Sequence, residues 1–206
     1  MRKILLLIFQ LLLWTSCQKK DSEYYKKTLA ELKIYARTSD ERNSSDIFHY
    51  VKDSESDNIY LLENPYLFEH SIKEKYFLDV LKKNGKVVYI GKKYGENDDG
   101  VMLFEQYYFD TDGKMIGITE GYKMAVFSKC AETIAYWKSF VINSSDELTL
   151  LKESFVDENE NPIVGRNDCK KMVENLKVKA ENNLMEKSQL KNLEDFMIAE
   201  KIKYYK

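Results

Sequence analysis

The chain has 206 residues, with 32 basic and 34 acidic side chains and a formal net charge of −2. The basic residues are scattered, which excludes nucleic-acid binding as a function because neutralising phosphates needs clustered cations. Proline (2) and glycine (8) are scarce beside 15 tyrosines, and this composition favours sheets and helices over disorder.

The N-terminus has the pattern of an export signal. Arg2 and Lys3 precede an apolar run over 4–13, interrupted only by Gln10. Charged residues from Lys19 onward end the run well short of the roughly 20 apolar residues that a membrane-spanning helix needs. We therefore expect residues 1–16 to be removed as a signal peptide.

The residues around Cys17 resemble a bacterial lipoprotein signal, in which an aliphatic residue and small residues lead into a cysteine. The resemblance implies cleavage after Ser16, fatty acylation of Cys17 (palmitate or similar chains) and anchoring to the outer membrane, at the periplasmic face or the cell surface. Trp14 departs from the usual leucine, and such relaxed signals are typical of Bacteroidota lipoproteins. The alternative is an ordinary cleaved signal that leaves a free thiol at Cys17.

The remaining chain has a suitable length for one domain. Without Arg2 and Lys3 the count is 30 basic against 34 acidic residues, a charge of −4. We predict a tether with a short helix over 17–45 and a single α+β domain over 46–206.

The first predicted elements are a helix and two strands. Asp21 or Ser22 can cap a helix that begins near Glu23 and carries apolar residues at spacings of three and four up to Tyr35. Residues 38–45 are polar and predict a loop. The runs 47–51 and 58–63 predict a strand pair, and 66–73 a helical turn.

From about residue 74 to 164 the pattern predicts an antiparallel β-meander. Hydrophobic runs at 76–81, 86–94, 101–109, 114–127, 131–142 and 147–156 are separated by short turns. Asn84-Gly85 is a strong hairpin signal because both residues tolerate positive φ. Connections this short cannot accommodate crossover helices, so neighbouring strands must be antiparallel.

One or two amphipathic helices are predicted over 167–203, and we expect them to cover the sheet. With Cys17 acylated, Cys130 and Cys169 remain as an even pair, which favours a disulfide between the strand region and the first of these helices. Two buried free thiols are the alternative.

No sequence motif indicates a metal or cofactor site. The turn 110–113 superficially resembles a calcium loop, but aligning Gly113 with the loop glycine places Tyr108 and Thr119 at ligand positions. The two histidines, His49 and His70, show no zinc spacing, and no phosphate loop or nucleophile elbow is present. We expect no metal site and no cofactor.

Aromatic residues on neighbouring predicted strands are the candidate binding surface, because exposed tyrosine and tryptophan are favoured in protein and glycan recognition. Core packing is nevertheless the favoured role for most of them, because aromatic residues are enriched in sheets. The candidates are Tyr107, Tyr108, Tyr122, Tyr136 and Trp137.

The segment from Tyr107 to Cys169 resembles lipoproteins of the Bacteroidota type, and this resemblance implies no particular activity. We expect a lipid-anchored cell-envelope binding or structural module with a protein or glycan partner. One alternative is an immunity-like protein that neutralises an envelope toxin, where an acidic domain would suit a basic partner. An enzyme is less favoured; the alternative in that class is a carboxylate-dependent hydrolase, which would need two close carboxylates in a deep pocket.

Overall fold

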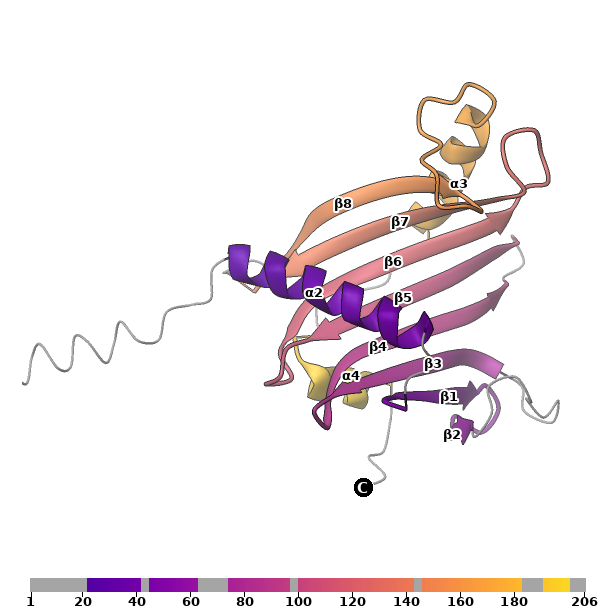
Figure 1. Cartoon of the computed structure of the whole chain (residues 1–206). Helices are drawn as coiled ribbons and strands as arrows, with labels where there is room; N and C mark the ends of the chain where they lie inside the picture. Colours follow the sequence, from indigo (N-terminus) through magenta and orange to yellow (C-terminus); the bar gives the residue numbers. More distant parts are fainter. Residues whose placement is uncertain are drawn as a thin grey trace, which may run out of the picture.

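The chain forms an eight-stranded antiparallel open sheet with three helices (Figure 1). The computed structural model describes residues 22–41, 45–62, 74–96, 100–142, 146–182 and 191–200. The strand order is β2-β1-β3-β4-β5-β6-β7-β8, so the predicted meander is confirmed from β3 to β8. The strands are β1 (Ile47–Asp53), β2 (Ile59–Leu62), β3 (Glu74–Lys83), β4 (Lys86–Glu96), β5 (Val101–Phe109), β6 (Met115–Ala125), β7 (Thr133–Ile142) and β8 (Leu148–Asp157).

Local turn chemistry sets the hairpins. Asn84 and Gly85 have φ values of 53° and 76°, which are those of the tight turn predicted between β3 and β4. Between β5 and β6, Asp110 Oδ1 accepts the backbone N–H groups of Asp112 and Lys114, and Gly113 takes a φ of 78°. This aspartate therefore folds a turn, as its residue type favours.

Helix α2 (Ser22–Glu41) packs diagonally across one face of the sheet (Figure 1). Leu29 lies over Gly117 of β6, and farther along the helix the Tyr35 hydroxyl donates to the carbonyl of Lys82 in β3. The predicted helix is confirmed, but the loop predicted from Thr38 is wrong up to Glu41. Its polar residues lie on the last turn of a helix whose other side packs on the sheet.

Helices α3 (Lys170–Asn182) and α4 (Leu193–Ala199) pack on the opposite face. Leu176 and Ala180 of α3 join Tyr122 and Tyr136 in one core cluster, while Phe196 of α4 contacts the Tyr107 ring at 4.8 Å. Both predicted helices are confirmed, and α3 ends at Asn182. The sequence predicted that the C-terminal helices cover one face of the sheet. It did not predict that α2 buries part of the other face.

The predicted disulfide is confirmed between Cys130, just before β7, and Cys169, just before α3, with Cα atoms 5.0 Å apart. Both cysteines are buried in the cluster beneath α3. The bond therefore ties the start of α3 to the sheet.

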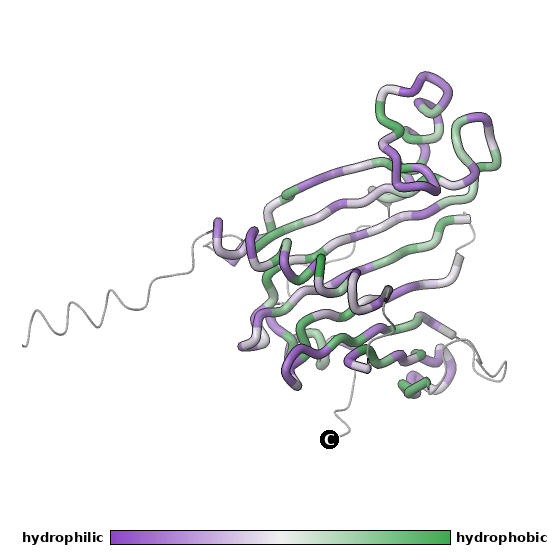
Figure 2. The backbone as a smooth tube through the Cα atoms, viewed as in Figure 1, coloured by the Kyte–Doolittle hydropathy of each residue, from purple (hydrophilic) through white to green (hydrophobic). Residues whose placement is uncertain are grey.

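Hydrophobic and hydrophilic residues are interspersed along the central strands (Figure 2). Nine of the eleven residues of β6, Met115–Tyr122 and Met124, are buried, because this strand is covered on both faces. Among the described helices, none combines the length and apolar composition needed to cross a bilayer. The predicted signal peptide, Cys17, the turn over 66–73 and His70 lie outside the described residues.

Candidate functional site

The structure separates Trp137 from the four tyrosines that the sequence grouped with it. Tyr107, Tyr108, Tyr122 and Tyr136 are at most 3 % exposed, so they are core residues and cannot form a contact surface. Tyr108 packs beneath α2, and the other three point to the face that α3 and α4 cover. Trp137 alone is half-buried.

Trp137 lies on the α2 face of the sheet, beyond the area that the helix covers. Its ring lies across Gly121 of β6, where an added Cβ would be 2.1 Å from Cζ3. The ring centroid of Phe104 in β5 is 5.9 Å away, at an interplanar angle of 44°. Together the two rings form an aromatic platform on the sheet, made possible by the absence of a side chain at residue 121.

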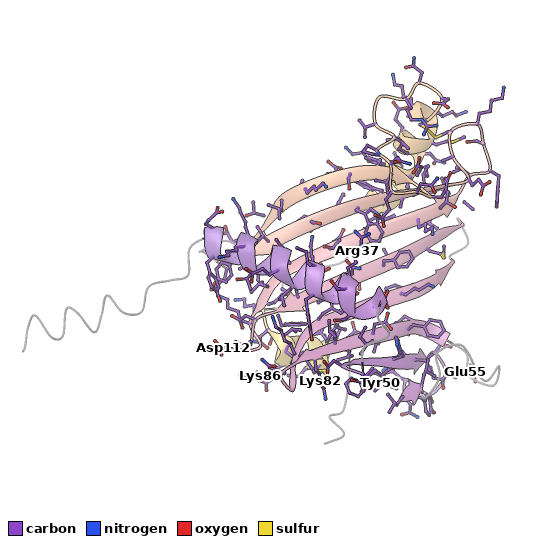
Figure 3. The ribbon with its side chains drawn as sticks, in the orientation of Figure 1. Arg37, Tyr50, Glu55, Lys82, Lys86 and Asp112 are labelled. Atoms are coloured by element: carbon purple, nitrogen blue, oxygen red, sulfur yellow. A yellow bond between two sulfur atoms is a disulfide. The ribbon has the colours of Figure 1, made fainter. Side chains whose placement is uncertain are left out.

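Cations surround this platform. Lys93 lies directly opposite Phe104 in the β4–β5 register, and Lys123 is two residues beyond Gly121, so both point to the platform side. Lys152 of β8 lies opposite Ser139, and Ser139 follows Trp137 by two residues in β7. Figure 3 shows Arg37 on the side of α2 that borders the uncovered strands. We call this surface the open face; it comprises Arg37, Lys93, Phe104, Lys123, Trp137 and Lys152.

The open face is cationic although the chain is acidic overall. Two anions border it: Glu160 lies 4.0 Å from Arg37, and Asp79 Oδ1 is 2.7 Å from Nδ1 of His49. Arg37 is therefore paired within the protein, and the positive charge beside the two aromatic rings comes from Lys93, Lys123 and Lys152.

A row of polar residues separates the open face from the apolar area under α2. The cross-strand register aligns His49, Asp79, Gly91, Gln106, Thr119, Ser139 and Lys152. Lys33 of α2 reaches this row, and its Nζ lies 2.8 Å from Ser139 Oγ. Burial and the nearby Lys152 lower the pKa of Lys33 to about 8.

The opposite face contains a buried ionic network. In the register across β4 to β8, Lys92, Glu105, Glu120, Lys138 and Glu153 are aligned. Lys92 Nζ lies 3.5 Å from Glu105 Oε2 and 2.6 Å from Oε1 of Glu200, the residue that follows α4. Tyr107 and Tyr94 donate to Glu105 at 3.0 and 3.2 Å. Burial, followed by the charge of Glu105, raises the pKa of both tyrosines.

This network does contain two adjacent carboxylates, Glu105 and Glu120, the feature that a carboxylate-dependent hydrolase would require. Both are at most 2 % exposed, and their oxygens accept from tyrosine hydroxyls. A shallow depression of about 300 Å³ lies elsewhere, between Lys82 and Lys86 of the β3–β4 hairpin and Asp112 (Figure 3). Neither carboxylate lines that depression, and Glu105 is linked through Lys92 to Glu200 at the end of α4.

Within the described ranges no group of three or more histidine, cysteine, aspartate or glutamate side chains is arranged to hold a metal ion. His49 lies in β1, as predicted, and its ring bonds Asp79. Of the open face, the sequence reasoning identified Trp137 and missed the other five residues: Arg37, Lys93, Phe104, Lys123 and Lys152. Strand alternation from Trp137 and the hairpin registers could have identified Phe104 and the three lysines, but nothing local indicates where α2 lies.

Comparison of the chain with protein-family models, with curated proteins and with solved structures found no match.

Proposed function

We propose that the protein is a lipid-anchored binding module of the cell envelope and that its open face binds anionic polysaccharide. The observation that carries this proposal is the Trp137 ring lying across Gly121, on the side of the sheet to which Lys93 and Lys123 also point. A flat aromatic ring offers its face to the C–H groups of a pyranose, and lysine and arginine pair with carboxylate groups on the sugar.

The charge of the surface supports an anionic rather than a neutral glycan. Arg37, Lys93, Lys123 and Lys152 come from four different elements and converge on one area. Carboxylates repeated along a polysaccharide can engage several of these cations at once, which strengthens binding without a deep pocket. The half-buried platform also fits a polymer better than a small molecule enclosed in a cavity.

The anchoring part of the proposal rests on the sequence around Cys17. Helix α2 begins at Ser22, five residues after this cysteine, so acylation would hold the domain close to the membrane by its first helix. Two or more acyl chains anchor a protein stably, at ~0.8 kcal/mol per buried CH₂. Mass spectrometry of the native protein should find acyl groups on Cys17, and an unmodified Cys17 in a protein released from membranes would refute the anchor.

Affinity electrophoresis tests the binding function. The purified protein should be retarded in native gels that contain polygalacturonate and not in gels that contain neutral dextran. W137A should weaken binding at least tenfold, which corresponds to about 1.4 kcal/mol. F127A is the matched control, because Phe127 is an exposed aromatic (84 %) in the β6–β7 connection, outside the open face.

The cations provide the second arm of this test. K93A/K123A should weaken binding to polygalacturonate and reduce its dependence on salt, whereas K171A, an exposed lysine of α3, should leave it unchanged. Equal migration with polygalacturonate and dextran, or wild-type retardation of W137A, would refute the proposed site.

A further inference from the structure

The Lys33–Ser139 pair at the border of the open face has the geometry of a nucleophile and its base. Lys33 Nζ is 2.8 Å from Ser139 Oγ, and Thr119 Oγ1 is 3.2 Å from the same oxygen. Ser139 is 8 % exposed, and Lys33 is half-buried. The hydroxyl is thus held from two sides by residues of α2 and β6.

Serine is a weak nucleophile unless an adjacent base takes its proton. A lysine can serve as that base when its neutral form is accessible, and serine–lysine pairs of this kind perform acyl transfer in unrelated folds. Burial of Lys33, together with Lys152, brings its pKa down to about 8, which is near the working range of a general base.

Burial and the charge of Lys152 favour the neutral form of Lys33. Lys152 of β8 repels the ammonium, and Arg37 lies one turn farther along α2. Toward the sheet, Lys33 contacts the Ser139 hydroxyl and the Tyr108 ring, whose centroid is 5.7 Å from Nζ. Within the described part of the chain, the contacts of Lys33 include no carboxylate that would stabilise its charge.

The pair lies next to the aromatic platform. Ser139 and Trp137 are two residues apart on the same side of β7, a separation of about 7 Å. A sugar ring stacked on Trp137 would therefore carry its ring substituents to Ser139 Oγ. Lys152, opposite Ser139 in the register, supplies a positive charge for a developing oxyanion.

We propose that Ser139 and Lys33 hydrolyse O-acyl esters carried by the anionic polysaccharide that binds the open face. This proposal rests on the proposed function for its substrate. The activity is that of a polysaccharide O-acyl esterase.

The reaction proceeds in two steps. Ser139 Oγ bonds to the acyl carbon as its proton passes to neutral Lys33; the acyl–O bond to the sugar then breaks, and the sugar oxygen takes that proton from Lys33. In the second step water attacks the acyl-serine, Lys33 takes a proton from the water, and Ser139 Oγ recovers it on leaving. The products are the free sugar hydroxyl and the carboxylic acid, and no oxidant or reductant is consumed.

The test is acetate release from O-acetylated polygalacturonate by the purified protein. S139A should abolish the release, and K33M should reduce it at least a hundredfold. S128A is the control, since Ser128 lies in the β6–β7 connection. The wild-type rate should rise with pH through about 8, because Lys33 must be neutral to accept the proton.

A covalent probe gives an independent readout. A fluorophosphonate should add its mass to the peptide that contains Ser139, and K33M should slow this labelling. Folding of each variant is checked by circular dichroism, and the conservative K33R, which stays charged, should behave as K33M does.

The outcomes separate the two proposals. If polygalacturonate retards the wild-type protein but the protein neither releases acetate nor is labelled at Ser139 at pH 9, the esterase proposal is overturned. The proposed binding function would then stand without it. If the wild-type protein hydrolyses p-nitrophenyl acetate, S139A does not, and polygalacturonate retards neither, the Ser139–Lys33 pair is supported as a catalytic pair. Anionic polysaccharide is then overturned as its substrate.

Discussion

The ring of Trp137 occupies the space in which a Cβ of residue 121 would stand, 2.1 Å from Cζ3. The two residues are directly opposite in the β6–β7 register. A side chain at 121 would lift the indole off the sheet and tilt it away from Phe104. The flat aromatic platform thus depends on a glycine in the middle of a buried strand, where glycine otherwise weakens the sheet.

Substituting this glycine gives the first prediction. G121A should destabilise the protein by about 1–3 kcal/mol, the usual cost of forcing extra atoms into a packed site. It should also shift the tryptophan fluorescence and weaken polygalacturonate binding. G95A is the matched control: Gly95 lies in β4, and an added Cβ there meets nothing within 4 Å. Similar urea midpoints for the two variants would contradict the packing argument.

The second prediction concerns Glu200, which joins α4 to the sheet. Its Oε1 lies 2.6 Å from Lys92 Nζ, Oε2 accepts from the Tyr76 hydroxyl, and its carbonyl accepts from Lys52 at 3.3 Å. Removing one partner of a buried ion pair costs about 3–5 kcal/mol. Because Glu200 is 20 % exposed, we expect E200A to lie at the lower end of this range. The urea midpoint of E200A measures this loss.

The control for E200A is E194Q, on the exposed side of α4. It should change the urea midpoint little, since it removes only a charge from the first helical turn, worth about 0.3–1 kcal/mol. Equal losses in the two variants would show that the buried contacts of Glu200 contribute nothing beyond helix electrostatics.

The third prediction concerns the disulfide, whose cysteines are 39 residues apart in sequence. Closing a loop of this length restricts the unfolded chain and should stabilise the protein by roughly 4 kcal/mol. Reduction should therefore lower the urea midpoint. The double variant C130S/C169S should unfold at the midpoint of the reduced protein and should not respond to reductant. A wild-type midpoint unchanged by reduction would exclude the bond.

Hairpins and helices could be predicted because their signals are local. Asn84-Gly85 allows the two positive φ angles of its turn, and the 101–109 run matches β5 residue for residue. The segment from Thr38 was wrongly predicted to be a loop because it is polar. A half-exposed helix needs apolar residues on only one side, so a polar last turn is compatible with a helix. The cysteine pairing followed from counting and agrees with the structure.

The candidate site could not be assembled in the same way. Alternation assigns Tyr136 and Trp137 to opposite faces, but it does not reveal which face a helix leaves uncovered. Lys33 and Ser139 are 106 residues apart and meet only because α2 crosses β7. The sequence therefore identified Trp137 but grouped it with four tyrosines whose side chains are buried in the core.

The tyrosine hydroxyls of the buried ionic network give the fourth prediction, on alkaline stability. Burial, with Glu105 and Glu120 nearby, raises the pKa of Tyr94, Tyr107 and Tyr122 above that of an exposed tyrosine. In the unfolded chain these groups ionise near pH 10. Their stabilising contribution is complete below pH 10 and declines as the pH rises toward their folded-state values, because only the unfolded state then loses the protons.

Absorbance at 295 nm, followed as a function of pH, measures this behaviour. The buried group should ionise only in a cooperative step that coincides with loss of the circular dichroism signal. Y107F removes one buried hydroxyl, so the step should shift to higher pH, whereas Y60F should leave it in place. Gradual ionisation of all tyrosines in a protein that stays folded would show that the hydroxyls beside Glu105 and Glu120 are open to solvent.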